Sequence, residues 1–168
     1  LGHRILLQAV RQFVQQNPKL KFVVLLEGNG SLKETIASYI SENDLSDYVK
    51  MIEEDYIYNL YNAIDILILP SLHNEDFPNT IIEAMGQGIP VIGSSIAGIP
   101  EQIDDHITGL LIPPGSPEAL CKSMIELSSD KDLYSLCSVN SKRKFEENYT
   151  AQISVNNYAE LYRSILNE

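Results

Sequence analysis

The sequence predicts an α/β protein built on a doubly wound parallel sheet. Continuous apolar runs alternate along the chain with segments in which apolar residues recur at helical spacing, the pattern of strands alternating with helices. The two clearest runs, at residues 21–27 and 64–69, are apolar nearly throughout, which favours strands covered on both faces. Glycine and proline mark the turns between segments. The 168 residues are enough for one such domain with a hydrophobic core.

The ends of the predicted elements are marked by residues that cap or break regular structure. The first helix ends at Asn17-Pro18, and Ser31 is placed to cap the second, with Glu34 as its capping-box partner. Near the C-terminal end of the sheet region, Ser116 is placed to cap another helix. We predict helices over 3–16, 32–43, 56–63, 79–87, 117–127, 130–147 and 151–166, a short helix at Glu101, and strands over 21–27, 48–52, 64–69, 91–93 and 109–112.

The composition is that of a globular domain with a strong negative charge. Hydrophobic residues make up 44% and charged residues 21% of the chain, and the net charge is −11, which disfavours a nucleic-acid partner held by phosphate contacts. Cys121 and Cys137 lie in helical segments without metal-ligand spacing and predict reduced thiols in a cytoplasmic protein. No apolar run approaches the about 20 residues of a membrane span, and we expect no signal peptide.

Two turns in the first half bear on ligand binding. Gly28-Asn29-Gly30 lets a backbone or a ligand approach closely, although the third glycine of the dinucleotide fingerprint is missing because position 33 is Lys. A tight strand-to-helix turn is the alternative. After the second strand come three acids, Glu53-Glu54-Asp55, which we expect to be solvated or to cap the next helix. That helix holds three tyrosines, which we expect to serve packing.

Residues 70–90 contain the strongest candidate site. A strand gives way to a polar loop and then to a short apolar helix, for which Pro78 suits the first position because no N–H is needed there. The first N–H groups of this helix, at Asn79, Thr80 and Ile81, point into the loop and with the helix dipole form an anion site suited to phosphate. In open α/β sheets, ligands bind at the carboxyl ends of strands.

Two carboxylates flank this anion site. Glu75 lies in the loop and Glu83 in the helix, with seven residues between them. Glu83 is surrounded in sequence by apolar residues, and a buried carboxylate is costly unless it is hydrogen-bonded. Sugar hydroxyls are one source of donors; backbone amides or a basic side chain of the same domain are the other. For Glu75, solvation by water is the simpler alternative.

An ordered series of short motifs runs through the second half of the chain. Glu75 is followed at the second position by an aromatic residue, Phe77, and after seven intervening residues by Glu83. The motifs that follow are Pro90-Val91, Gly98-Ile99-Pro100-Glu101, Gly109-Leu110-Leu111 and Pro114-Gly115. This series resembles the C-terminal half of the glycosyltransferases of family 4, also called group 1.

The resemblance implies that residues 1–168 are the C-terminal, nucleotide-sugar-binding domain of such an enzyme, one Rossmann-like half of a GT-B fold. It implies that an N-terminal acceptor domain and a first strand are absent from this chain, so that the fragment alone is inactive. The implied reaction is retaining transfer of a sugar from a UDP- or GDP-sugar to an acceptor hydroxyl, without a metal, in polysaccharide or glycoconjugate biosynthesis. Peripheral membrane contact is allowed through the missing domain.

The resemblance also implies roles for particular residues. Glu83 would accept hydrogen bonds from the ribose hydroxyls, and Glu75 would hold the donor sugar. The phosphate-facing turn would be formed by Phe77, Pro78, Asn79 and Thr80. The nucleotide would be lined by Gly28, Gly30, Ile52, Glu53 and Gly98. Leu1 stands where the family has a lysine before Gly2, so either this protein departs from the pattern or its lysine lies further upstream, and the basic phosphate contacts remain unassigned.

Two other function classes fit the same fold. A nucleotide-sugar-binding relative, such as an epimerase or a binding module, would grip the ligand without transferring the sugar, and acceptor-dependent release of nucleotide distinguishes it from a transferase. A receiver-type regulatory domain needs an aspartate at a strand end. The clear strands here end at Glu27 and Pro70, which disfavours that class.

Overall fold

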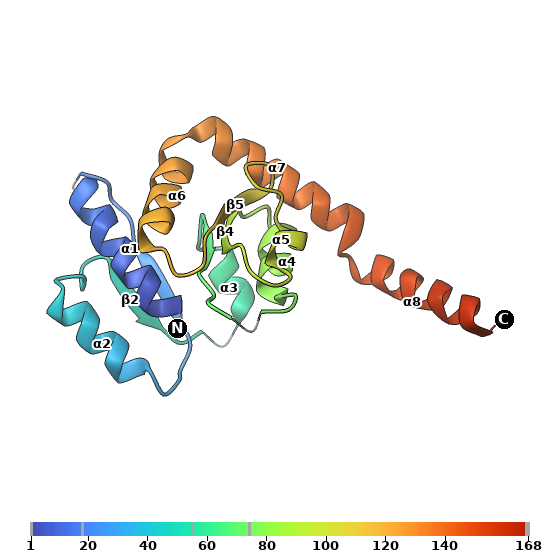
Figure 1. The fold of residues 1–168 in the computed structure, drawn as a ribbon, viewed down its shortest axis with the longest axis horizontal. Helices are drawn as coiled ribbons and strands as arrows, with labels where there is room; N and C mark the ends of the chain where they lie inside the picture. Colours follow the sequence, from blue (N-terminus) through green and yellow to red (C-terminus); the bar gives the residue numbers. More distant parts are fainter. Residues whose placement is uncertain (1, 18, 55, 74, 167–168) are drawn as a thin grey trace.

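The computed structural model describes residues 2–17, 19–54, 56–73 and 75–166, and the predicted α/β alternation is confirmed (Figure 1). The strands of the described chain are β1 (Val24–Glu27), β2 (Val49–Ile52), β3 (Leu67–Leu69), β4 (Val91–Ser94) and β5 (Gly109–Ile112). Its helices are α1 (Gly2–Gln16), α2 (Lys33–Glu42), α3 (Ile57–Tyr61), α4 (Asn79–Gly86), α5 (Ile99–Gln102), α6 (Pro117–Ser129), α7 (Lys131–Asn148) and α8 (Ala151–Leu166).

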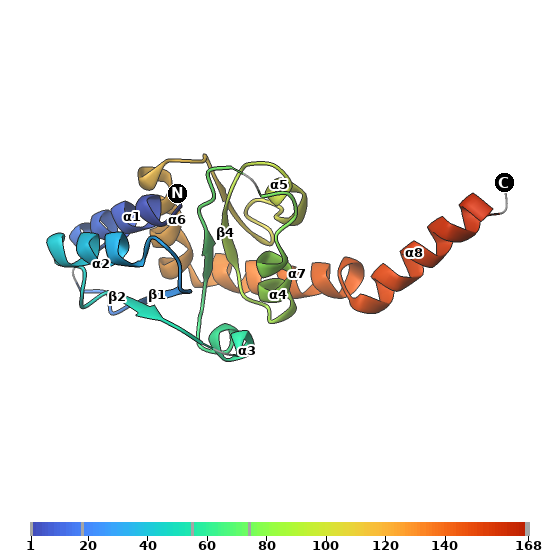
Figure 2. The ribbon, with the colours of Figure 1, turned by 90° about the horizontal axis from the view of Figure 1, so that it is seen from below.

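All the strand pairs of the described chain are parallel, but they form two sheets. In the first sheet β1 pairs with β2, with Val24 opposite Val49. In the second sheet β3, β4 and β5 lie side by side in that order, with Leu67 opposite Val91 and Val91 opposite Gly109. Within the described residues no ladder joins β1 to β3, and Figure 2 shows β1 and β2 set apart from β4. The expected parallel class is therefore present, but as two sheets rather than one.

Helices cover both faces of the three-stranded sheet, as a doubly wound fold requires. Successive residues of a strand point to opposite faces. In β4, Ile92 belongs to the core that contains Leu7 of α1 and Leu120 of α6, whereas Val91 belongs to the core that contains Ile81 of α4. Helix α1 packs against α6 on the first side, and α4 packs against α7 on the second (Figures 1 and 2).

The two long apolar runs are strands over only part of their length. β1 begins at Val24, and Val23 before it is 55% exposed. β3 covers three residues of the run predicted over 64–69, and each of them is half-buried. The expectation of strands buried throughout is therefore wrong for these segments, because the edges of β1 and β3 that face each other border a cavity instead of a neighbouring strand.

The capping predictions succeed at one helix and fail at another. Ser116 caps α6 as predicted. The predicted capping box of Ser31 and Glu34 is wrong, because α2 begins at Lys33 and receives no side-chain hydrogen bond at its N-cap from the described residues. The Lys33 N–H donates instead to the Gly30 carbonyl at 3.0 Å, and this turn leaves Ser31 outside the helix.

Helix α8 extends away from the rest of the molecule (Figure 1). None of its described residues is buried. Its exposed apolar side chains are Val155, Tyr158, Leu161, Tyr162, Ile165 and Leu166. In the part of the chain that the structure describes, no helix combines the length and the apolar character that crossing a membrane would require.

Both cysteines are unpaired, as predicted, and both are buried. Burial raises the pKa of the Cys121 thiol. Burial, with a smaller effect of the nearby Asp105 and Glu126 carboxylates, raises the pKa of the Cys137 thiol to about 11. Only the thiolate attacks a disulfide reagent, so a raised pKa together with burial makes both thiols unreactive near neutral pH.

We expect a chromogenic disulfide reagent at about pH 8 to modify both thiols far more slowly in the native chain than in the chain unfolded by guanidinium chloride. Free cysteine at the same pH is the control, and the release of the coloured thiol is the measurement. A native thiol that reacts as fast as free cysteine would contradict the buried positions.

Candidate functional site

The candidate site consists of the loop between β3 and α4 and the first turn of α4. The predicted order of strand, loop and short helix is confirmed, with α4 starting at Asn79. Pro78 is the N-cap residue, with φ −64° and ψ 125°, rather than the first helical residue. The loop leaves the carboxyl end of β3. The loop after β4 leaves the same edge of the sheet because the two strands are parallel.

The start of α4 presents free backbone donors. The N–H groups of Asn79 and Thr80 have no acceptor among the residues that the structure describes. The Ile81 N–H, predicted as a third free donor, donates to the Pro78 carbonyl at 3.3 Å, so that part of the prediction is wrong. The first turn, all of whose residues are described, carries no acidic side chain. These donors and the helix dipole therefore give a local positive potential in an otherwise acidic chain.

Glu75 is half-buried and is held in place by groups of this chain. The Ser71 hydroxyl donates to Glu75 Oε1 at 2.9 Å, and the Gly98 N–H donates to the Glu75 carbonyl oxygen at 3.3 Å. Across the described ranges, Oε2 receives no hydrogen bond. The carboxylate therefore has a defined position and one oxygen that can accept another donor.

Glu83 receives a hydrogen bond from a tyrosine that was expected only to pack. The Tyr61 hydroxyl, on α3, donates to Glu83 Oε2 at 2.7 Å, and Tyr61 is only 4% exposed. Burial and the neighbouring Glu83 carboxylate raise the pKa of Tyr61, so the phenol stays protonated and remains a donor. The donors expected for Glu83 were sugar hydroxyls, or backbone amides or a basic side chain of the same domain. The domain does supply a donor, but it is a tyrosine hydroxyl and not an amide or a basic group. Glu83 Oε1 accepts no hydrogen bond from the described residues.

A cavity of about 1260 Å³ lies between β1 and β3, next to the candidate site. Of the predicted site residues, Glu75 and Thr80 line it. Glu83 does not line it and contacts one of its lining residues, Tyr61. The described polar and charged side chains of the lining include His3, Glu27, Tyr61, Ser71, His73, Glu75 and Thr80.

The residues predicted to line the nucleotide at β1 and β2 lie at the carboxyl ends of those strands. Gly28 has φ +127°, and its N–H donates to the Ile52 carbonyl at 3.2 Å, so its conformation requires glycine. Around Gly30, by contrast, no described atom lies within 4 Å of the position that a Cβ would occupy. The Glu53 carboxylate pairs with the Lys33 ammonium, and both side chains are about half exposed.

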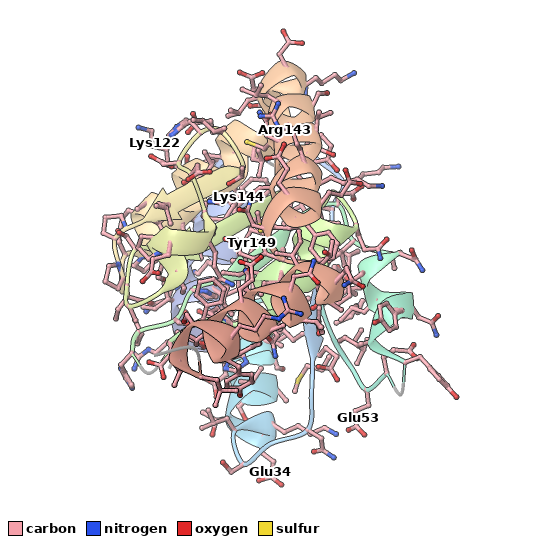
Figure 3. All side chains as sticks on the ribbon, turned by 90° about the vertical axis from the view of Figure 1, so that its right-hand side faces the viewer. Glu34, Glu53, Lys122, Arg143, Lys144 and Tyr149 are labelled. Atoms are coloured by element: carbon pink, nitrogen blue, oxygen red, sulfur yellow. The ribbon has the colours of Figure 1, made fainter. Side chains whose placement is uncertain are left out.

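This exposed ion pair agrees with the expectation that the acids after β2 are not ligand groups (Figure 3 labels Glu53). Glu54 Oε1 accepts the Tyr56 N–H at 3.1 Å and the Asn59 side-chain amide at 3.2 Å, so it bonds groups near the start of α3, although no side chain caps this helix among the described residues. Asp55, the third acid of this run, lies outside the described residues.

Gly98 is buried beneath the loop rather than open to a ligand. A Cβ at Gly98 would overlap the carbonyl oxygen of Asp76. Its φ is −83°, which any residue can adopt, so close approach to the Asp76 carbonyl oxygen is the reason for glycine here. The buried Gln102 donates to the Pro78 carbonyl at 3.1 Å. Helix α5 thus supports the loop at two points, from its N-cap Gly98 and from its last residue, Gln102, and no pattern in the sequence pointed to Gln102.

Phe77 contacts the end of α7. Its ring is edge-on to the ring of Tyr149, with the ring centroids 5.9 Å apart, and it is 43% exposed. Lys144 on the same helix donates to the Glu101 carbonyl at 3.3 Å and to Asp104 Oδ2 at 2.9 Å, so this lysine is already paired (Figure 3 labels Lys144 and Tyr149). The Phe77 ring thus holds the loop against the end of α7, and Lys144 holds the end of α5 and the turn after it against the same helix.

The basic phosphate contacts remain unassigned. Leu1, where the family has lysine, lies outside the described residues, and Arg4 is exposed on α1. Among the side chains that the structure describes, no group of three or more His, Cys, Asp or Glu residues is arranged to hold a metal ion.

Comparison with known proteins gives a consistent family. The model of the family "Glycosyl transferases group 1" matches residues 2–147. The amylovoran biosynthesis glycosyltransferase AmsK of Erwinia amylovora is 29% identical over 95% of this chain and 41% of its own length. The capsular polysaccharide biosynthesis glycosyltransferase CapM of Staphylococcus aureus is 24% identical over 99% of this chain and 44% of its own. The chain thus spans less than half the length of these relatives.

Solved structures agree with this match. A glycosyltransferase from Rickettsia africae superposes with a TM-score of 0.89 at 25% identity, over 98% of this chain and 44% of that one. HepE of Anabaena, solved in complex with UDP-glucose, gives a TM-score of 0.87 at 22% identity over 97% and 45%, a likeness of fold. Since the family model covers most of the sequence, the chain belongs to the group 1 glycosyltransferases.

Proposed function

We propose that this chain is the donor-binding part of a retaining glycosyltransferase, which transfers a sugar from a UDP- or GDP-sugar to an acceptor hydroxyl in polysaccharide or glycoconjugate biosynthesis. The observation that carries the proposal is the loop before α4, where two free backbone donors lie between two carboxylates that each keep one oxygen unbonded by the described residues. HepE, similar in fold, was solved with UDP-glucose, which supports a nucleotide-sugar ligand.

The N–H groups of Asn79 and Thr80 would bind the diphosphate. A leaving nucleotide diphosphate gains negative charge as its bond to the sugar breaks, and preorganised N–H groups stabilise that charge without reorganising. The net charge of −11 repels an anionic donor at long range, so these contacts have to be local. In this proposal the amides and the helix dipole supply the stabilisation, and no metal is needed.

The two carboxylates would hold the rings on either side of the diphosphate. The Tyr61 hydroxyl already donates to Glu83 Oε2, so Oε1 is the oxygen that would accept a hydrogen bond from a ribose hydroxyl. The Ser71 hydroxyl already donates to Glu75 Oε1, so Oε2 would accept a hydrogen bond from a hydroxyl of the donor sugar. A carboxylate whose second oxygen is already bonded has fewer rotamers to lose when a ligand binds, which favours affinity.

The nucleoside would extend toward the ends of β1 and β2. Gly28, Gly30 and Ile52 offer backbone groups there. The Glu53 side chain pairs with Lys33, so a contact with the base would come from the Glu53 backbone and not from its carboxylate. Gly98 would not contact the ligand directly. Because it has no side chain, the loop before α4 can lie close to α5.

The test uses the full-length protein that contains this chain, incubated with UDP- and GDP-sugars in the presence and absence of saccharide acceptors. Release of free nucleotide that depends on the acceptor supports transfer, and an anomeric product of unchanged configuration supports retention. Binding without acceptor-dependent release would favour a nucleotide-sugar-binding relative instead. The 168-residue chain is a parallel sample, in which we expect binding without transfer.

Replacing Glu83 with alanine should weaken nucleotide-sugar binding about tenfold or more, because a hydrogen bond to a charged group contributes about 1.5–3 kcal/mol. Isothermal titration calorimetry measures the change, and circular dichroism checks that the variant is folded. Glu160→Ala, at an exposed position of α8, is the matched control and should bind normally. Unchanged affinity in folded Glu83→Ala rejects the ribose role.

Tyr61→Phe should lower the free energy of unfolding by about 1 kcal/mol, because it removes the donor to Glu83 while keeping the ring. It should also weaken binding by a smaller factor than Glu83→Ala, since the carboxylate remains but is no longer oriented. Tyr58→Phe on the same helix is the control, because Tyr58 is 65% exposed. Equal stability and affinity for the two variants would remove Tyr61 from the site.

Gly98→Ala should displace the loop, since the new Cβ would overlap the Asp76 carbonyl oxygen. We expect a loss of about 2 kcal/mol or more in the free energy of unfolding, measured by urea denaturation, and weaker donor binding. Gly30→Ala, where no described atom stands in the way, should change stability by less than about 0.5 kcal/mol. A harmless Gly98→Ala would show that the loop is not held against α5.

A further inference from the structure

Helix α7 holds the C-terminal end of α4. The Ser138 hydroxyl donates to the carbonyl of Gly88, just beyond α4, at 2.7 Å. A Cβ at Gly86, the last residue of α4, would lie 3.2 Å from the ring of Phe145, so that ring packs directly against the helix backbone. The C-terminal end of α4 is therefore fixed to α7 by a hydrogen bond and by an aromatic ring.

The C-terminal end of α7 also reaches the loop in front of α4. Tyr149 follows Phe145 by four residues and donates its N–H to the Phe145 carbonyl, so the two side chains lie on the same side of α7. The Tyr149 ring meets the Phe77 ring edge-on, with the ring centroids 5.9 Å apart. The end of α7 thus contacts α4 at its last residue and the loop just before its first.

Phe77 is joined to the free donors of α4 by a short, stiff connection. Only Pro78 separates it from Asn79, and the proline ring restricts the φ of Pro78, which is −64°. Phe77 Cδ2 lies 3.4 Å from the position that a Cβ of Gly98 would take, so the ring is held between the start of α5 and the end of α7. A shift of the Phe77 ring would therefore turn the N–H groups of Asn79 and Thr80.

The backbone around Tyr149 is itself well held. Tyr149 is the C-cap residue of α7, and its N–H bond to Phe145 is 2.8 Å long. The hydroxyl of the next residue, Thr150, accepts the Ile153 N–H at 3.3 Å at the start of α8. Lys144 joins α7 to the end of α5 (Figure 3 labels Lys144 and Tyr149). The ring therefore projects from a backbone whose position is set by neighbouring helices.

The Tyr149 ring makes the contact with Phe77, and the hydroxyl forms no hydrogen bond with the residues that the structure describes. Burial, and after it the Asp104 and Glu101 carboxylates, raise the pKa of Tyr149, so the phenol stays neutral near neutral pH. Packing alone explains the pair poorly, because Phe77 stays 43% exposed and buries little area. The distinguishing feature of the pair is its place, two residues before the first free N–H.

We propose that Tyr149 is a positioning residue of the donor site: its ring sets the place of Phe77 and so directs the Asn79 and Thr80 N–H groups toward the diphosphate. This role rests on the proposed function, in which those two N–H groups bind the diphosphate. A hydrogen bond weakens steeply as its donor turns away from the acceptor, and donors already in position lose less freedom when a ligand binds. Tyr149 itself would not touch the ligand.

The test measures nucleotide affinity in the full-length protein that contains this chain. UDP and GDP are titrated by isothermal titration calorimetry, and uridine and guanosine, which lack phosphate, by ligand-observed NMR. We expect Tyr149→Ala to weaken binding of the nucleoside diphosphate about tenfold, as for one lost hydrogen bond to a charged group, and to change nucleoside affinity less than about twofold. Misdirected N–H groups predict a loss confined to the phosphate-bearing ligand, whereas general destabilisation does not.

Three further variants separate the ring from other effects. Tyr149→Phe keeps the ring and should bind as the unmutated protein does. Tyr158→Ala removes an aromatic side chain of α8 that is 62% exposed, and it should also bind normally. If Tyr149 acts through Phe77, then Tyr149→Ala should cause no further loss in a protein that already carries Phe77→Ala, since the two effects are then not additive.

Equal losses for the nucleoside diphosphate and its nucleoside, or unchanged diphosphate affinity in folded Tyr149→Ala, would overturn the proposal and leave the proposed function standing. Where circular dichroism shows Tyr149→Ala to be unfolded, Phe77→Ala, at a half-exposed position, carries the same comparison, and equal losses there overturn the proposal as well. Failure of the unmutated protein to bind any nucleoside diphosphate would overturn both.

Discussion

Parallel pairing of β3, β4 and β5 is the constraint on which the candidate site depends. Parallel strands end at one edge of the sheet, so the loops that follow β3 and β4 are brought side by side although they are far apart in the sequence. Close contact between these loops is then possible only where one of them has no side chain, which is the place of Gly98 against Asp76. Gln102 adds a hydrogen bond to Pro78 from the same side. The position of the start of α4 is therefore set by contacts with Gly98 and Gln102, which lie outside this helix.

The electrostatic potential at the start of α4 is positive, opposite in sign to the net charge of the chain. A net charge of −11 gives an unfavourable field for any anion, yet the first turn of α4 carries no acid and presents two N–H groups without an acceptor among the described residues. The nearby carboxylates are each held by a neutral hydroxyl, Ser71 or Tyr61, instead of by a lysine or arginine. A neutral donor fixes the carboxylate while leaving its charge uncancelled, so each acid remains a strong acceptor for hydroxyl groups.

The sequence predicted the elements well and their lateral contacts poorly. Helical spacing and apolar runs identified the helices and strands to within a few residues, and the motif series from Glu75 to Gly115 identified the family. Periodicity does not reveal which strand edges meet, so the place of the interruption, between β1 and β3, could not be read from the spacing of apolar residues. The Tyr61–Glu83 hydrogen bond joins residues 22 positions apart on two helices, and no local pattern signals it. Gly98 was singled out by its place in the motif series, and nothing in the sequence reveals that it allows the close approach of the Asp76 carbonyl.

Helix α8 has a thermodynamic consequence for the whole chain. A lone helix of its length is marginal in water, and the tertiary burial that normally stabilises a helix is missing from its described residues. Its sixteen residues therefore fall outside the cooperative unit formed by the two cores. Heating would fray this arm gradually, over a range below the sharp melting of the sheet and its covering helices, so far-ultraviolet ellipticity would begin to decline before the calorimetric peak.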